Sequence, residues 1–174
     1  ITKMSQIHFA CTEEYRNRII QLGELPSNVY NVGGLGIENI NKLNLLDRDG
    51  FEKSIDCKLK SSNYLVTFHP VTLDKYSAET QFSALINSLD KLDDSLIIFT
   101  KPNADNDGRI IIELIEEYVS KNKHKAVAFT SLGQLRYLSA IPFMTAVVGN
   151  SSSGLLEVPS FRIPTVNIGD RQRG

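Results

Sequence analysis

The chain has 174 residues, of which 19 are basic and 20 acidic, so its formal net charge is −1. A chain of this length can bury a full core and indicates one domain with an appendage. Without a basic run, a membrane-length apolar stretch or a visible signal peptide, the sequence argues against nucleic-acid and membrane surfaces and predicts a cytoplasmic protein.

The first part of the chain predicts short, mixed elements. Residues 1–5 resemble the last turn of a helix, residues 7–11 a strand, and residues 12–22 a helix that ends at Gly23. A second strand over residues 28–33 leads into Gly33-Gly34-Leu35-Gly36. This run lacks the third glycine of a dinucleotide fingerprint, because position 39 is Asn39, and therefore predicts a turn or an interdomain hinge. Residues 40–62 indicate one or two short helices.

The rest of the chain alternates strands and helices regularly. Strands are predicted at residues 64–68, 96–100, 126–129, 145–148 and 163–169. Two helices follow from apolar residues at helical spacing, and a third from the capping-box pattern Ser131-Leu132-Gly133-Gln134. Repeated β-α units of this kind predict an α/β fold with a doubly wound, mainly parallel, Rossmann-like sheet that is covered on both faces. In such sheets ligands bind outside the carboxyl ends of the strands.

That rule selects candidate site residues at several strand ends. His69 follows the strand at residues 64–68, and Pro70 fixes the turn after it. Pro102-Asn103, Thr130-Ser131 and Arg171 follow other predicted strands. His69 is either a ligand contact or a histidine bonded to loop backbone, and Asn103 is either a contact or an ordinary turn residue. Phe129 is either a contact or part of the core.

The most informative stretch is Gly149-Asn150-Ser151-Ser152-Ser153-Gly154, which follows the strand at residues 145–148. Small residues let backbone approach a ligand, and a helix beginning here would direct unpaired N–H groups at a phosphate. The alternative is a serine-rich turn that only caps a helix. Glu157, about one turn along, is placed to accept hydrogen bonds from a sugar diol, and the Arg171 guanidinium can hold phosphate bidentately. Together these residues predict a nucleotide diphosphate pocket.

These segments carry a resemblance to a known family. The serine loop, Glu157-Val158-Pro159-Ser160-Phe161 and the run from Pro164 to Gln172 resemble the signature of the hydrolysing UDP-N-acetylglucosamine 2-epimerases. The similarity extends to Thr67-Phe68-His69-Pro70-Val71-Thr72. His69 followed by proline is similar to the hydrolysing branch, whereas the non-hydrolysing relatives carry His-Arg. The family makes N-acetylmannosamine-type sugars for sialic-acid-type sugar biosynthesis.

The resemblance implies roles for the candidate residues. His69 is expected to contact the diphosphate and to act in catalysis, with UDP binding shared among the remaining candidates: Ser151, Ser152, Ser153, Gly154, Glu157, Arg171, Asn103 and Phe129. The reaction it implies has two stages: UDP leaves C1 of the sugar as C2 loses a proton, and water then adds to the glycal. Neither a cofactor nor a metal is expected, and Cys11 and Cys57 have no metal-ligand spacing.

The resemblance also implies the C-terminal, nucleotide-binding half of a two-domain GT-B-like enzyme. Residues 1–40 would lead from a preceding N-terminal domain or hinge, and residues 41–174 would form a UDP-binding domain without its closing helix. The acid and base groups are then expected outside this chain, which alone would be inactive. The exact sugar and the oligomeric state stay open, a homo-oligomer included. A glycosyltransferase donor domain and a non-catalytic UDP-sugar sensor are the alternatives.

Overall fold

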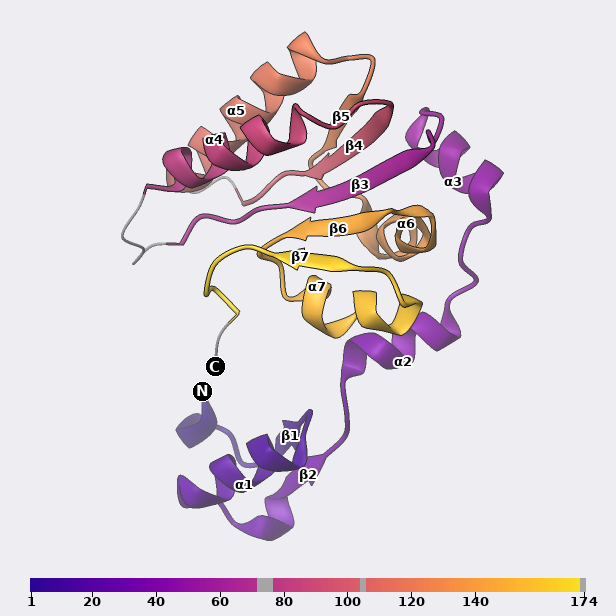
Figure 1. The fold of residues 1–174 in the computed structure, drawn as a ribbon. Coiled ribbons are helices and arrows are strands. Elements are labelled where there is room, and N and C mark those ends of the chain that lie inside the picture. Colours follow the sequence, from indigo (N-terminus) through magenta and orange to yellow (C-terminus); the bar gives the residue numbers. More distant parts are fainter. Residues whose placement is uncertain (72–76, 104–105, 173–174) are drawn as a thin grey trace. The chain divides into compact units, whose positions relative to one another are not determined.

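The computed structural model describes residues 1–71, 77–103 and 106–172. The chain divides into two compact units, Ile1–Leu43 and Asn44–Gly174 (Figure 1). The sequence placed this boundary at residues 40 and 41. No described helix has both the length and the apolar character needed to cross a bilayer.

The first unit is a small parallel sheet with short helices. Its elements are a 3₁₀ turn at Thr2–Met4, strand β1 (His8–Ala10), helix α1 (Glu13–Gln21), a 3₁₀ turn at Pro26–Asn28, strand β2 (Val29–Asn31) and helix α2 (Leu35–Lys42). The hydroxyl of Thr12 accepts a hydrogen bond from the backbone N–H of Tyr15, so Thr12 caps α1 at the point where the sequence predicted the helix to begin. The prediction of a turn over residues 33–36 was wrong in part, because α2 already begins at Leu35.

The second unit carries a five-stranded parallel sheet in the order β5-β4-β3-β6-β7. Its strands are β3 (Ser62–Thr67), β4 (Ser95–Thr100), β5 (Ala126–Phe129), β6 (Ala146–Gly149) and β7 (Thr165–Asn167). Its helices are α3 (Arg48–Ile55), α4 (Ala78–Leu89), α5 (Asn106–Lys121), α6 (Gly133–Ala140) and α7 (Ser153–Leu156), with 3₁₀ turns at Ile141–Phe143 and Val158–Phe161. The predicted α/β fold with a doubly wound parallel sheet is confirmed.

Helices cover both faces of this sheet, because its central strands are apolar on both faces. Val66 and Phe99 pack toward α4 and α5, and Leu65 and Ile98 alternate with them and are fully buried. Figure 1 shows α4 and α5 on one face and α6 and α7 on the other. Thr67 and Thr100, which are register partners at the ends of β3 and β4, follow the same alternation and share the face of Leu65 and Ile98.

The chain order creates a topological switch beside β3. The chain runs outward from β3 through β4 to β5 and then returns to place β6 on the other side of β3. In a sheet of this kind the carboxyl ends of the two strands at the switch frame a ligand crevice. Here those ends carry His69 after β3 and Asn150 after β6. The topology therefore places the strand-end candidates of the sequence at one edge of the sheet.

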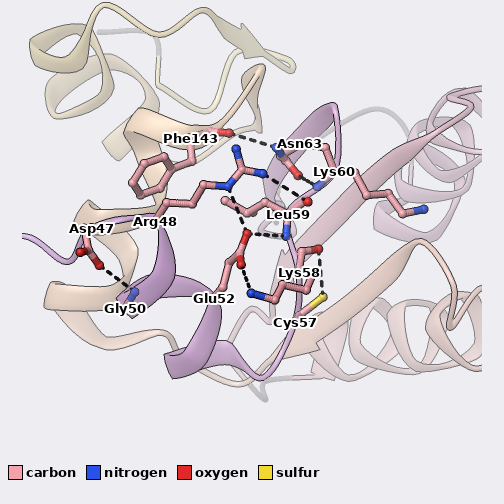
Figure 2. A network of polar contacts seen from close by, with 10 residues as sticks. All are labelled: Asp47, Arg48, Gly50, Glu52, Cys57, Lys58, Leu59, Lys60, Asn63 and Phe143. Atoms are coloured by element: carbon pink, nitrogen blue, oxygen red, sulfur yellow. Dashed lines mark hydrogen bonds and ion pairs between the residues drawn. The ribbon is translucent and has the colours of Figure 1, made fainter.

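A polar network ties the segment before β3 to α3 (Figure 2). The carboxylate of Glu52 is buried and accepts hydrogen bonds from Lys58 Nζ at 2.6 Å, Arg48 Nε at 3.1 Å and the backbone N–H of Leu59 at 3.1 Å. These donors lower the pKa of Glu52 to about 2, the hydrogen bond from Lys58 having the largest effect. Three donors on one carboxylate hold the start of β3 in place.

Candidate functional site

A cavity of about 510 Å³ opens at the carboxyl ends of β3, β4 and β5. Its described wall comes from these strand ends, from α6 and from the end of α7: Thr67, His69, Thr100, Lys101, Asn103, Thr130, Ser131, Leu132, Gly133, Gln134, Tyr137, Leu138 and Glu157. This volume lies within the range typical of pockets for small ligands. The cavity is thus located where the fold predicts a binding site.

Three residues predicted from the sequence meet in this wall. His69 reaches it from β3, Asn103 from β4 and Glu157 from the end of α7. Glu157 lies about one turn along from the start of α7, as the sequence predicted, and it is the C-cap residue of this helix. Its carboxylate is therefore presented by a helix end, next to the hydroxyls of the cavity.

A helix begins within the serine loop, as the sequence predicted, but it is very short. Ser152 is the N-cap of α7, yet its side chain makes no capping hydrogen bond, and α7 is only four residues long. A helix this short has a weak dipole, so the dipole argument for phosphate binding does not apply. Ser151 and Gly154 border a separate small hollow of about 10 Å³ between β6 and α7.

Arg171 and Phe129 lie near the cavity but not in its described wall. Arg171 follows β7, and its Nη1 donates to the backbone carbonyl of Asn150 at 3.0 Å. Phe129 is the last residue of β5, whereas Thr130 and Ser131, which the sequence placed at this strand end, line the cavity. Ser131 does not cap α6 as predicted, because Leu132 is the N-cap; its hydroxyl instead accepts from the N–H of Gly133 at 3.0 Å.

The sequence analysis missed three hydroxyl groups in the wall of the cavity, those of Thr67, Thr100 and Tyr137. Thr67 and Thr100 share a hydrogen bond of 2.5 Å between their hydroxyl oxygens. The hydroxyls of Tyr137 and Ser153 are buried, and neither meets hydrogen-bond geometry with any described residue. Burial raises the pKa of Tyr137 and the charge of Glu157 adds to that, while the nearby hydroxyls of Ser153 and Thr67 act in the opposite direction. Thr67 and Thr100 could have been identified from the sequence as candidates, because they lie at the carboxyl ends of predicted strands.

The charged groups of the wall are few. Lys101, directly after β4, forms an ion pair with Glu116 at 2.6 Å, and its side chain is largely buried. No group of three or more His, Cys, Asp or Glu residues within the described ranges could hold a metal ion. The wall therefore offers mainly hydroxyl, amide and single charged groups, which suit a polar organic ligand.

Comparison with known proteins assigns the class. The pattern of the UDP-N-acetylglucosamine 2-epimerase family matches residues 1–174, so the chain belongs to this family. A solved UDP-GlcNAc 2-epimerase from Neisseria meningitidis, crystallised with UDP-GlcNAc, superposes with a TM-score of 0.74 over 97% of this chain and 46% of its own. Its sequence identity of 16% means that this likeness concerns the fold.

Two curated relatives are closer in sequence. One is a GDP/UDP-N,N'-diacetylbacillosamine 2-epimerase (hydrolyzing) from Campylobacter jejuni, 43% identical over 100% of this chain and 45% of its own length. The other is a polysialic acid biosynthesis protein from Escherichia coli, 39% identical over 100% of this chain and 44% of its length. The chain therefore spans less than half the length of these relatives. The matches give no support to the expectation that it is the C-terminal part of such an enzyme.

Proposed function

We propose that this chain forms the UDP-binding part of a hydrolysing 2-epimerase that acts on a UDP-sugar. The observation that carries the proposal is the cavity, where His69, Asn103 and Glu157 meet from three elements at the carboxyl edge of a switch-type sheet. Membership in the epimerase family supports it. His69 followed by Pro70 favours the hydrolytic branch.

The roles follow from the chemistry of each group. Glu157 accepts hydrogen bonds from the ribose diol, and Asn103 and the backbone beside Phe129 lie near the nucleoside. His69 and Arg171 bind the diphosphate, with Ser151, Ser152, Ser153 and Gly154 contributing small polar contacts. In the reaction, C2 of the sugar loses a proton, the C1–O bond breaks and UDP leaves; water then adds across the resulting double bond. His69 stabilises the charge that grows on the departing UDP. No residue of this chain is proposed as the base.

The sugar is proposed to be an N,N'-diacetylbacillosamine. The relative that acts on this sugar is 43% identical to the chain over its full length. Because that relative's name includes both GDP and UDP, the identity of the nucleobase, guanine or uracil, is a second point to test. The E. coli relative supports instead a place in sialic-acid-type sugar biosynthesis, for which UDP-N-acetylglucosamine is the alternative substrate.

Two experiments test the proposal. Calorimetry on the 174-residue chain should show weak binding of UDP and weaker binding of GDP, and a coupled assay should show no turnover. The full-length protein should convert UDP-N,N'-diacetylbacillosamine to the free 2-epimerised sugar plus UDP faster than it converts UDP-N-acetylglucosamine. Turnover by the 174-residue chain alone would contradict the proposal. Glycosylation of an acceptor would indicate a transferase, and unchanged ligand a sensor.

A further inference from the structure

Asn150, the first residue after β6, is almost completely buried, at 1% exposure. Its side-chain amide forms two short hydrogen bonds with the backbone of one residue. Oδ1 accepts from the N–H of His69 at 2.7 Å, and Nδ2 donates to the carbonyl of His69 at 2.7 Å. The backbone N–H of Asn150 also donates to the carbonyl of Thr67 at 3.1 Å. The β3–β6 pairing, whose last register pair is Thr67 and Gly149, is thereby continued by a side chain.

The carbonyl of Asn150 connects to a third strand. It accepts hydrogen bonds from Arg171 Nη1 and from Gln172 Nε2, each at 3.0 Å. These residues follow β7, which is separated from β3 by β6. A single buried residue therefore contacts both His69 and Arg171, although the strands that carry them are not neighbours.

We propose that Asn150 is a positioning residue that holds His69 and Arg171 in a fixed relation for binding a nucleoside diphosphate. This inference rests on the proposed function. Both backbone groups of His69 are engaged, which fixes its φ and ψ and so the direction of its side chain. Only a carboxamide of this length supplies an acceptor and a donor to the same residue. Aspartate would place an oxygen against the carbonyl of His69, and serine is too short for both bonds.

Asn63 provides a matched control at the opposite end of β3. It is also buried, at 5% exposure, and its amide also binds backbone only. Oδ1 accepts from the N–H of Lys60 at 2.9 Å, and Nδ2 donates to the carbonyls of Lys60 at 3.1 Å and Phe143 at 3.2 Å (Figure 2). Asn63 is not among the described residues that line the cavity. Replacing it therefore measures how much a buried amide contributes to stability apart from ligand binding.

The experiment compares Asn150→Ser with Asn63→Ser in the full-length protein. Both variants should lower the unfolding temperature. At a temperature where both are folded, only Asn150→Ser should weaken UDP binding, by between about 10- and 100-fold, because small displacements of contacting groups have effects of this size. The loss of UDP affinity caused by Asn150→Ser should also be non-additive with the loss caused by His69→Ala, because Asn150 acts through His69. Unchanged UDP affinity, equal weakening by Asn63→Ser, or additivity with His69→Ala would overturn the inference.

Two further measurements keep the test decisive. If Asn150→Ser does not fold, Asn150→Asp keeps the side-chain shape but replaces the donor with a charged carboxylate oxygen, and UDP affinity should fall at least as much. If neither folds, a cycle of His69→Ala and Arg171→Ala leaves Asn150 intact, and strictly additive losses would overturn the inference. Wild-type protein that does not bind UDP would instead contradict the proposed function.

Discussion

Glu157 is the residue whose proposed role separates nucleoside binding from phosphate binding. It lines the cavity at the end of α7, where its carboxylate can accept hydrogen bonds from both hydroxyls of a ribose. Glu157→Gln should weaken UDP binding by about 1–3 kcal/mol, the scale for hydrogen bonds to a charged group. Calorimetry with UDP and with pyrophosphate, which has no ribose, measures the difference. An equal loss for both ligands would mean that the serine loop had collapsed.

His69 and Arg171 should differ in the kinetic constant that each affects. In the full-length protein His69→Ala should lower kcat by about 10²-fold, as for other groups that stabilise developing charge. Arg171→Ala should mainly raise KM, because a permanent cation binds the diphosphate in the ground and transition states alike. Steady-state kinetics on folded variants measures both constants.

Arg162, an exposed arginine before β7, is the matched control for Arg171. Arg162→Ala should leave KM unchanged. A His69→Ala enzyme with near-normal kcat would leave His69 as a binding or structural residue only.

At the scale of elements, the network on α3 should make stability depend on acid. The folded-state pKa of Glu52 is about 2, below its ordinary value of 4.5. Such a group contributes stability that is fully present above pH 4.5 and is lost as the pH falls toward 2. Glu52→Gln should therefore reduce stability at neutral pH and flatten its decline in this range. Urea unfolding of both proteins at several pH values between about 6 and 2 measures this pH dependence of the free energy of unfolding.

Glu117 is the control for Glu52. Its pKa is also lowered, by the hydrogen bond from Lys121, but both side chains of this pair are exposed. Exposed pairs contribute little to stability, so Glu117→Gln should change the acid dependence much less. Equal effects of the two substitutions would show that burial of Glu52 is unimportant.

Gly149 ends β6 at a point where no side chain fits. Its φ is +142°, and an added Cβ would lie 1.8 Å from the carbonyl oxygen of Thr67. Gly149→Ala should destabilise the protein by about 3 kcal/mol or more, because backbone of the central strand would have to move. Gly169→Ala is the control, with φ +68° and no atom within 4 Å, and should cost only about 1–2 kcal/mol. Thermal unfolding distinguishes the two; similar losses would contradict the steric argument.

At the scale of the whole molecule, the sequence predicted the sheet better than the site. The strand at residues 126–129 was predicted with the bounds of β5, because a short apolar run is enclosed by Lys125 and Thr130. The start of α7 was predicted from the serine loop, whereas its end at Leu156 was not, although Pro159 is a local signal against a longer helix. The position of Tyr137 in the cavity wall depends on how α6 packs against the sheet, which no local sequence pattern encodes. The bond between Asn150 and His69 joins residues 81 apart, so only the folded chain reveals it.

The return of the chain to β3 also determines the order in which the protein can fold. The start of β3 is joined to the segment before β6 by a hydrogen bond between Asn63 and Thr145, which are 82 residues apart. During synthesis β3 can pair with β4 early, but its other edge must wait until β6 has been made. Closing so long a loop slows folding, and an unpaired edge of a central, apolar strand is a template for aggregation. The arrangement that places the cavity at the switch point thus leaves one edge of β3 open to aggregation in the nascent chain until β6 has been made.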